Sequence, residues 1–268
     1  MESTHLGKLE AWFRALDGSL TAFSGGVDSA LVLFLSKRYL GSRGVGVISD
    51  SPSLKRSDLK IAREFCKSHD INLRIIHTRE LDDPNYAANP VDRCFHCKSN
   101  LYTDLIALQN QYPGYALING TNTDDLGDYR PGLKAAEQNA IRSPLAECGL
   151  GKTAIRRLAR HFDLAVWNKP ASPCLSSRIP YGQPVTSVKL WQIEAAEEII
   201  GKLGFERVRV RHIDGVAQIE VPLVDVPRLR QVLETVSRQI IELGYSSVEA
   251  DDEGLVSGKL NRAILEHG

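Results

Sequence analysis

The amino-acid sequence predicts an α/β protein in which a doubly wound parallel sheet is followed by a smaller α+β domain. Between residues 19 and 120, short apolar segments alternate with segments of helical period, as they do in βαβ units. After residue 186 the predicted order changes to helix, strand, strand, helix, strand. A stretch with four prolines separates the two patterns. We therefore expect domains at 1–165 and 187–268, joined by an ordered loop at 166–186.

The first domain is expected to contain four parallel strands with helices between them. Strands are predicted at the short apolar runs, which are 19–23, 44–49, 72–77 and 115–119. Helices are predicted at 6–16, 28–40, 54–69 and 95–110. Sheets of this kind bind ligands at the carboxyl ends of their strands. The loop that ends the first strand is therefore expected at the binding edge.

The second domain is expected to be a small α+β unit. Its pattern predicts helices at 187–203 and 226–243, and strands at 207–213, 216–221 and 246–250. Asp214-Gly215, between the first two of these strands, is typical of a tight hairpin turn.

Composition narrows the class of function. The chain has 268 residues, of which 43% are hydrophobic and 25% charged, as in ordinary soluble domains. Its 33 basic and 33 acidic residues cancel, so bulk charge favours neither nucleic acid nor an anionic membrane as a partner. No apolar run approaches the ~20 residues that span a bilayer, and the first residues lead into an amphipathic helix rather than a signal peptide. We expect a cytoplasmic protein.

The most informative segment is a glycine turn between the first strand and the next helix. Its two glycines let backbone N–H groups approach an anion, and the helix start adds unpaired donors and a dipole. Its aspartate would repel a phosphate unless Mg²⁺ joined the two, since that ion binds carboxylates together with phosphates. The segment thus predicts a phosphate site with Mg²⁺; the alternative is a turn that serves strand-to-helix geometry alone. Its residues are Ser24, Gly25, Gly26, Val27, Asp28 and Ser29.

The spacing of this segment excludes two common nucleotide motifs. Neither G-x-x-x-x-G-K-[ST] nor G-x-G-x-x-G is present. The pattern S-G-G-x-D-S instead resembles the pyrophosphate loop, or PP-loop, of the N-type ATP pyrophosphatases. That resemblance implies that ATP adenylates a substrate and that pyrophosphate leaves.

Three of the five cysteines indicate a metal site. Cys94 and Cys97 form a C-x-x-C pair at the start of a helix, and Cys174 lies in a proline-bounded loop without an evident packing role. Three thiolates suit a [4Fe-4S] cluster with one open iron. The alternatives are zinc, with His96 as a further ligand, and unligated thiols. Cys66 is expected to pack in the core.

Two further segments of the first domain carry candidate ligands. Gly120, after the fourth strand, would let adenine or ribose approach the backbone, and the aspartates that follow it are either metal ligands or part of a solvated turn. Arg130, beside a turn at 131–132, would clamp a phosphate bidentately; the alternative is a surface arginine.

In the second domain, three arginines are expected on one face of a strand. Arg207, Arg209 and Arg211 alternate with valines, and period-two spacing places alternate residues on the same side. A solvated sheet face is the ordinary meaning of such a pattern. We expect Arg209 and Arg211 to bind a substrate phosphate, with Glu197 on the preceding helix as an orienting carboxylate or salt-bridge partner.

Five motifs together resemble the LarE family of sulfur transferases, over about residues 5 to 260. In order they are Ser-Gly-Gly-Val-Asp-Ser, Asp-Tyr-Arg-Pro-Gly-Leu-Lys-Ala, Trp-Asn-Lys-Pro-Ala-Ser, Ser-Ser-Arg-Ile-Pro-Tyr-Gly and Val-Arg-Val-Arg. The resemblance implies that ATP adenylates a carboxylate of a pyridinium dicarboxylate mononucleotide and that pyrophosphate leaves. Sulfur then replaces AMP to give a thiocarboxylate, a step in making the nickel-pincer nucleotide cofactor of lactate racemase. It also implies a homo-oligomer.

The resemblance assigns roles to single residues. Ser24 to Ser29 and Arg130 would serve the ATP phosphates. Family members that give up their own cysteine sulfur need no C-x-x-C pair, so this chain resembles the branch that carries a [4Fe-4S] cluster and keeps Cys174. The positions at which the family places its sulfur-transfer and substrate-phosphate residues are Ser177, Arg178, Glu197, Arg209 and Arg211.

Two other functions remain open from the sequence. A PP-loop enzyme that thiolates transfer RNA would share the first motif, although zero net charge and the lack of an added basic or zinc-ribbon module argue against it. A regulatory ATP-binding module with structural zinc would release no pyrophosphate.

Overall fold

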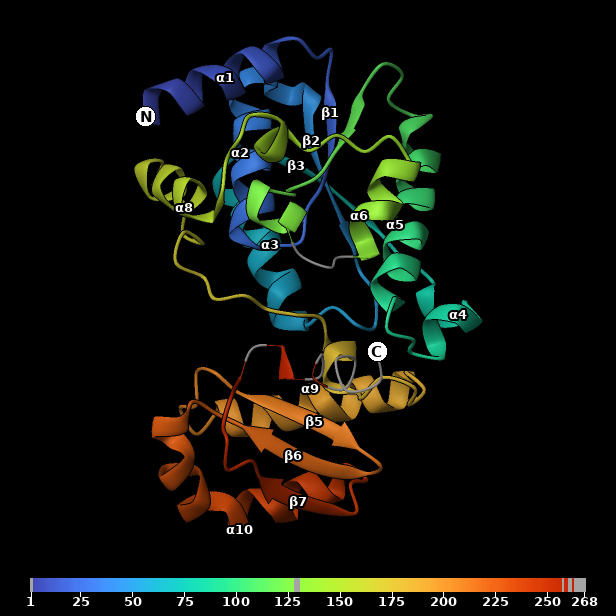
Figure 1. Cartoon of the computed structure of the whole chain (residues 1–268), viewed down its shortest axis with the longest axis vertical. Coiled ribbons are helices and arrows are strands. Elements are labelled where there is room, and N and C mark those ends of the chain that lie inside the picture. Colours follow the sequence, from blue (N-terminus) through green and yellow to red (C-terminus); the bar gives the residue numbers. More distant parts are fainter. Residues whose placement is uncertain (1, 128–130, 257, 260–261, 263–268) are drawn as a thin grey trace. The chain divides into compact units, whose positions relative to one another are not determined.

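The computed structural model describes residues 2–127, 131–256, 258–259 and 262 (Figure 1). Arg130, one of the predicted phosphate ligands, lies outside the described residues. The chain divides into two compact units. The first unit comprises Met1–Glu80 and Asp92–Ser172, and the second comprises Leu81–Val91 and Pro173–Gly268.

An all-parallel sheet of four strands forms the centre of the first unit. Ser19 pairs with Gly44 of one neighbouring strand and with Ala116 of the other. The strand order reverses between the first and fourth strands, which is where sheets of this class bind ligands. In the order β3-β2-β1-β4, the strands are β1 (Ser19–Ala22), β2 (Gly44–Ser49), β3 (Asn72–Ile76) and β4 (Ala116–Ile118).

Helices cover both faces of this sheet (Figure 1). One face packs against α1 (Glu2–Arg14), α2 (Val27–Leu40), α3 (Arg56–Ser68) and α8 (Lys152–His161). The other face packs against α5 (Arg93–Gln109) and α6 (Pro131–Gln138). Strand residues alternate between the two hydrophobic clusters, so that Val47 joins the α5 side and Ile48 the α2 side. This arrangement confirms the predicted doubly wound α/β class.

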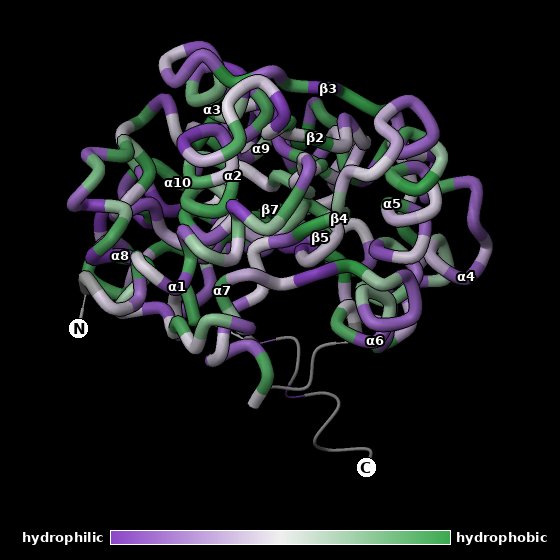
Figure 2. Tube along the Cα trace, turned by 90° about the horizontal axis from the view of Figure 1, so that it is seen from above, coloured by the Kyte–Doolittle hydropathy of each residue, from purple (hydrophilic) through white to green (hydrophobic). Residues whose placement is uncertain are grey.

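The strands and helices predicted between residues 6 and 119 are confirmed, with bounds that differ by a few residues. The sequence pattern predicted no helix or strand between β4 and residue 165, but this segment forms α6, α7 (Pro144–Glu147) and α8. Figure 2 shows hydrophilic and apolar stretches alternating along α5 and α6, as expected of helices that cover a sheet with one face.

The second unit is a three-stranded sheet with two long helices. β5 (Arg209–Ile213) and β6 (Val216–Glu220) are antiparallel, while β7 (Ser247–Ala250) runs parallel to β6. α9 (Ser187–Gly201) and α10 (Val226–Glu242) share a hydrophobic cluster with these strands. Asp214 and Gly215 both have positive φ, 48° and 86°, as the predicted hairpin turn requires.

A short segment from the middle of the chain also belongs to the second unit. Leu81–Val91 contains α4 (Pro84–Ala87), whereas the domains expected from the sequence were continuous in the chain. The buried Asn89 donates its side-chain amide to three carbonyl oxygens, those of Ile179, Pro180 and Gln183. No helix in the described ranges is both long and apolar enough to cross a membrane.

Candidate functional site

The PP-loop joins β1 to α2 in a conformation that its own hydroxyl groups stabilise. Gly25 has a φ of 73°, a left-handed conformation that favours glycine, and Gly26 caps α2. The Ser24 amide donates to Ser29 Oγ at 3.2 Å, and Ser29 Oγ donates to the Gly26 carbonyl at 3.2 Å. Contacts within the loop therefore hold its backbone, with the N-terminus of α2 beside it.

A cavity of about 420 Å³ opens beside this loop. It lies within the first unit, next to the loops that follow β1 and β4, as the parallel sheet predicts. Both acidic and basic side chains line it. Its lining residues are Ser24, Gly26, Val27, Asp28, Asn122, Asp124, Asp125, Lys152, Arg156, Lys169, Pro170, Ala171 and Ser172.

The two carboxylate oxygens of Asp28 differ in their contacts. Its Oδ2 forms an ion pair with Lys152 Nζ. Its Oδ1 is buried and has no hydrogen-bond partner among the described residues. A buried carboxylate oxygen without a partner is costly unless a ligand completes it. Asp28 and Asp124, in the same cavity, are oxygen donors of the kind that Mg²⁺ prefers, so the residues present fit that ion.

Lys169, a residue of the cavity lining, contacts the PP-loop directly. Its Nζ donates to the Gly25 carbonyl at 3.1 Å and pairs with Asp58 Oδ1 at 2.9 Å. Ser172 Oγ donates to the other oxygen of Asp58 at 2.7 Å. The Lys169 and Asp58 side chains are largely buried, so this contact fixes the loop from two separate segments.

Gly120 brings the loop after β4 against the start of α2. A Cβ atom at Gly120 would lie 2.6 Å from the Ser29 backbone nitrogen, a distance that real Cβ atoms do not adopt. The close approach that requires glycine here is therefore to the chain's own backbone. The following turn is held by side chains, because Asn119 accepts the Thr121 amide and Asn122 accepts the Asp124 amide.

Two cations of the cavity, Lys152 and Arg156, were not expected from the sequence. Both lie on α8, which begins directly after Gly151. The sequence feature that could have indicated them is a glycine-rich segment directly before a helix whose first residue is lysine, Gly149-Leu150-Gly151-Lys152-Thr153. Lys169, by contrast, belongs to the Trp-Asn-Lys-Pro-Ala-Ser motif, although no role was assigned to it.

The five cysteines fall into two groups by burial. Burial raises the pKa of the Cys66 thiol to about 12 and also raises the pKa of Cys148. Cys94 and Cys174 are exposed, and Cys97 is half-buried. Accessibility thus favours the predicted three as ligands over the other two.

The predicted cluster ligands lie in different units. Cys94 and Cys97 lie near the start of α5, three residues apart and on one face of the helix. Cys174, in the second unit, caps a 3₁₀ turn at Leu175–Arg178. Within the described residues no three His, Cys, Asp or Glu side chains gather as a metal site. The three-cysteine site therefore stays a prediction.

In the second unit, Arg178 is buried and donates hydrogen bonds from all three of its guanidinium nitrogens. Its Nε donates to Glu197 Oε1 at 2.8 Å, and Glu197 Oε1 also accepts the Val210 amide at 3.2 Å. Its Nη1 donates to Ser177 Oγ at 2.9 Å and to the carbonyls of Pro173 and Cys174 at 2.8 and 3.2 Å. Arg178 thus ties the Cys174 loop to α9 and β5.

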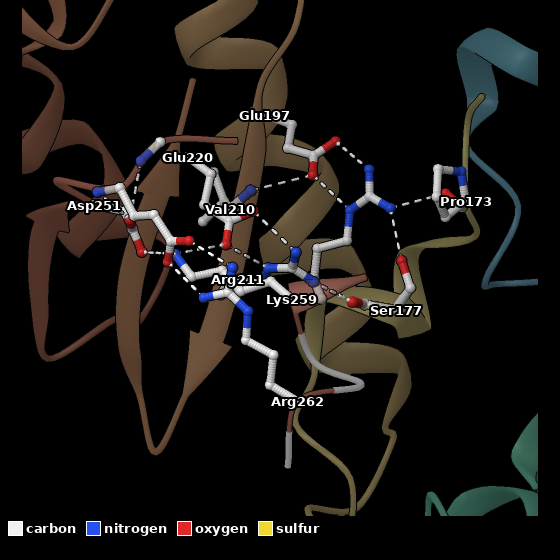
Figure 3. Close-up of polar contacts among 12 residues, drawn as sticks. Pro173, Ser177, Glu197, Val210, Arg211, Glu220, Asp251, Lys259 and Arg262 are labelled. Atoms are coloured by element: carbon white, nitrogen blue, oxygen red, sulfur yellow. Dashed lines mark hydrogen bonds and ion pairs between the residues drawn. The ribbon is translucent and has the colours of Figure 1, made fainter. Parts of the chain in front are cut away.

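Arg211 is likewise neutralised inside the unit. Its guanidinium meets Glu220 on the neighbouring strand in two parallel hydrogen bonds of 3.0 and 2.9 Å. Lys259 adds to this group through Glu220 and Asp251 (Figure 3). The arginine face is therefore less cationic than its sequence implied, because the acids come from other segments.

Arg207 precedes β5 and is exposed, so the prediction that it shares the strand face was wrong. Arg209 lies in β5 and differs from Arg211. Among the described residues it has no hydrogen-bond or ion-pair partner, and it is half-buried. Burial, together with the nearby charges of Arg178 and Arg211, lowers the pKa of its guanidinium from the usual value. A half-buried guanidinium without a described carboxylate partner can bind an anionic group.

Three curated proteins resemble this chain over most of its length, and no protein-family model matches it. An uncharacterized protein of Synechocystis is 39% identical over 99% of this chain and 100% of its own length. The pyridinium-3,5-bisthiocarboxylic acid mononucleotide synthase of Lactiplantibacillus plantarum is 34% identical, covering 98% and 96%. An uncharacterized protein of Methanocaldococcus jannaschii is 27% identical, covering 85% and 87%.

Proposed function

The chain belongs to the LarE family of sulfur transferases, and we propose that it uses ATP to convert a carboxylate of a pyridinium dicarboxylate mononucleotide into a thiocarboxylate. The Lactiplantibacillus relative is named for a bisthiocarboxylic acid product, whose oxygen counterpart is the dicarboxylate. The product would serve nickel-pincer nucleotide cofactor biosynthesis.

One observation supports the ATP-dependent step more than any other. The cavity of the first unit combines a preformed PP-loop, a carboxylate with an unpartnered buried oxygen, and lysine and arginine side chains. Backbone N–H groups and cations bind phosphates, while the carboxylate binds the metal that accompanies them. This set suits adenylation, in which negative charge builds on the departing pyrophosphate.

The reaction proposed for this cavity has two bond exchanges. A carboxylate oxygen of the substrate bonds to the α-phosphorus of ATP, and the bond from that phosphorus to the oxygen bridging the β-phosphorus breaks. Pyrophosphate leaves with the electron pair. Sulfur then attacks the acyl carbon and AMP departs. Mg²⁺, held by Asp28 with Asp124 and phosphate oxygens, would neutralise charge on the phosphates.

The chain's own residues would orient these groups. Lys169 keeps the PP-loop in place through Gly25 and Asp58, and Lys152 supplies positive charge near Asp28. In the second unit, Arg209 would hold the substrate phosphate, and Arg178 would set the position of the Cys174 loop. Arg211 would support that face through its pair with Glu220.

The sulfur source proposed here is a [4Fe-4S] cluster held by Cys94, Cys97 and Cys174. The accessible thiols on α5 and at the 3₁₀ turn fit iron ligation in residue type and exposure. When bound, such a cluster would supply a sulfide kept deprotonated by the metal.

Substrate-dependent pyrophosphate release tests this function. ATP, Mg²⁺ and the dicarboxylate mononucleotide should release pyrophosphate, and protein loaded with its sulfur source should also release AMP; omission of the dicarboxylate should abolish both. Asp28→Asn should lower the rate by roughly a hundredfold, the usual effect of losing one preorganised electrostatic contact. ADP and phosphate as products, or release stimulated by transfer RNA instead, would contradict the proposal. The exposed Asp163→Asn is a suitable control because it lies after α8 and away from the cavity lining.

A further inference from the structure

Lys152 forms an ion pair that the proposed chemistry would have to break. It is the first residue of α8, and its ammonium group contacts Asp28 on α2, 124 residues earlier in the chain. The Lys152 side chain is 41% exposed and that of Asp28 is 23% exposed, so the pair lies at the cavity rather than in the core.

The backbone of Lys152 is held in place by the loop after β4. Its N–H donates to Asp124 Oδ2 at 2.7 Å, and Asp124 is itself positioned because its amide donates to Asn122 Oδ1 at 3.0 Å. A Cβ atom at Gly151 would lie 2.7 Å from Asp124 Oδ1, so Asp124 can approach this closely only because residue 151 is glycine. The start of α8 is fixed, and only the flexible part of Lys152 is free to move.

The other two described cations of the cavity, Lys169 and Arg156, already have hydrogen-bond or ion-pair partners. Lys169 bonds Gly25 and Asp58 with a side chain that is only 16% exposed. Arg156 donates to the carbonyls of Trp167 and Lys169 at 3.0 and 3.2 Å. Lys152 differs because its partner is Asp28, the carboxylate whose second oxygen fits a metal ion. An ammonium group on that carboxylate would repel a divalent cation and compete for its charge.

We propose that Lys152 is an exchangeable cation that couples metal binding to nucleotide binding, an inference that rests on the proposed adenylation. Without nucleotide, Lys152 neutralises Asp28 and keeps metal affinity low. When ATP enters with Mg²⁺, Lys152 moves to the β- and γ-phosphates and Asp28 turns to the metal. As the α-phosphorus bond breaks, the lysine charge stabilises the pyrophosphate that takes the electron pair.

Titration with Mn²⁺ alone, followed by electron paramagnetic resonance, tests the exchange without turnover. In Lys152→Met, removal of the competing charge should tighten Mn²⁺ binding by roughly three- to fivefold, in keeping with a partly exposed ion pair. Lys152→Arg keeps the pair and should bind as the wild type does. Arg157→Met removes an exposed charge from the same helix and should leave Mn²⁺ affinity nearly unchanged.

The double variant Asp28→Asn/Lys152→Met tests whether Lys152 changes Mn²⁺ affinity through the Asp28 carboxylate. It should bind Mn²⁺ no more tightly than Asp28→Asn alone, because the lysine acts through that carboxylate. Unchanged or weaker binding by Lys152→Met, in a protein with wild-type circular dichroism and melting temperature, would overturn the proposal. Equally tight Mn²⁺ binding by Arg157→Met would also overturn it, because the effect would then come from removing any positive charge on α8 rather than from the pair with Asp28.

Pyrophosphate release supplies the second readout. Lys152→Met should lower its rate by roughly a hundredfold, and Lys152→Arg should recover most of the loss. A full rate in Lys152→Met would overturn the transfer to the phosphates. If the wild type released no pyrophosphate with the dicarboxylate while the Mn²⁺ results held, the proposed reaction would fail and the competition at Asp28 would stand.

Discussion

Arg178 and Arg211 stabilise the second unit through buried ion pairs. Each is less than 5% exposed and each meets a buried glutamate, Glu197 or Glu220. A buried charge is tolerated only when it is paired and hydrogen-bonded. Their first effect is therefore to fix the Cys174 loop and the β5 face, on which Arg209 is the cation without a described partner.

Glu197→Ala should destabilise the second unit because it leaves Arg178 buried without its carboxylate. We expect a loss of about 3 to 5 kcal/mol in the free energy of unfolding, measured by urea denaturation. Glu234→Ala is the matched control, because Glu234 pairs with Arg238 on the solvent side of α10. Its loss should stay below about 0.5 kcal/mol. Equal losses in the two variants would contradict this account of Arg178.

The cysteines should differ in reactivity according to burial. At pH 8 the Cys66 thiol stays protonated, because burial raises its pKa to about 12, and it becomes reactive only as the pH rises toward that value. Iodoacetamide labelling of the cluster-free protein, followed by mass spectrometry, should modify Cys94 and Cys174 first. Rapid labelling of Cys66 at pH 8 would refute the assignment of that thiol to the core.

At the scale of elements, the strands and helices between residues 6 and 119 could be predicted, whereas α6, α7, α8 and the contacts between distant loops were missed. Strands with continuous apolar runs and helices with a clear period were predicted at or near their positions. α7 is a single turn, too short for periodicity to reveal. The Glu220 partner of Arg211 depends on the pairing register of β5 and β6, which local patterns do not specify.

The same limit applied to the candidate site. The PP-loop was recognisable because its chemistry lies in six consecutive residues. The pair of Asp28 with Lys152 joins α2 to α8 across more than a hundred residues, so it became visible only in the fold. Gly120 was predicted to matter, but the reason found is the close packing of the β4 loop against α2.

Gly120→Ala should therefore damage the first unit at the junction of two elements. Its Cβ would collide with the Ser29 backbone, and we expect a loss of about 1 to 3 kcal/mol in unfolding free energy with weaker ATP binding. Gly7→Ala is the control, since it lies in α1 with open space around it. That change should stabilise the helix by about 0.5 to 1 kcal/mol. Calorimetry and ATP titration of both variants distinguish packing from a general effect of added methyl groups.

At the scale of the whole molecule, the proposal needs cysteines from both units to act together. Protein purified without oxygen should contain about four iron and four acid-labile sulfide atoms per chain. Cys94→Ala should lose them, whereas Cys66→Ala should retain them. Stoichiometric zinc in place of iron would refute the cluster. Conversion of Cys174 to dehydroalanine after turnover, seen by mass spectrometry, would show that the cysteine itself gives up the sulfur.

We propose that the first unit activates a carboxylate by adenylation before sulfur arrives. The most direct test of this proposal uses the pyridinium dicarboxylate mononucleotide with ¹⁸O in its carboxylates, incubated with ATP, Mg²⁺ and the cluster-loaded protein. If a carboxylate oxygen attacks the α-phosphorus, each AMP formed should carry one ¹⁸O atom and the substrate should gain sulfur in its place. Unlabelled AMP, or ADP as the nucleotide product, would contradict the account.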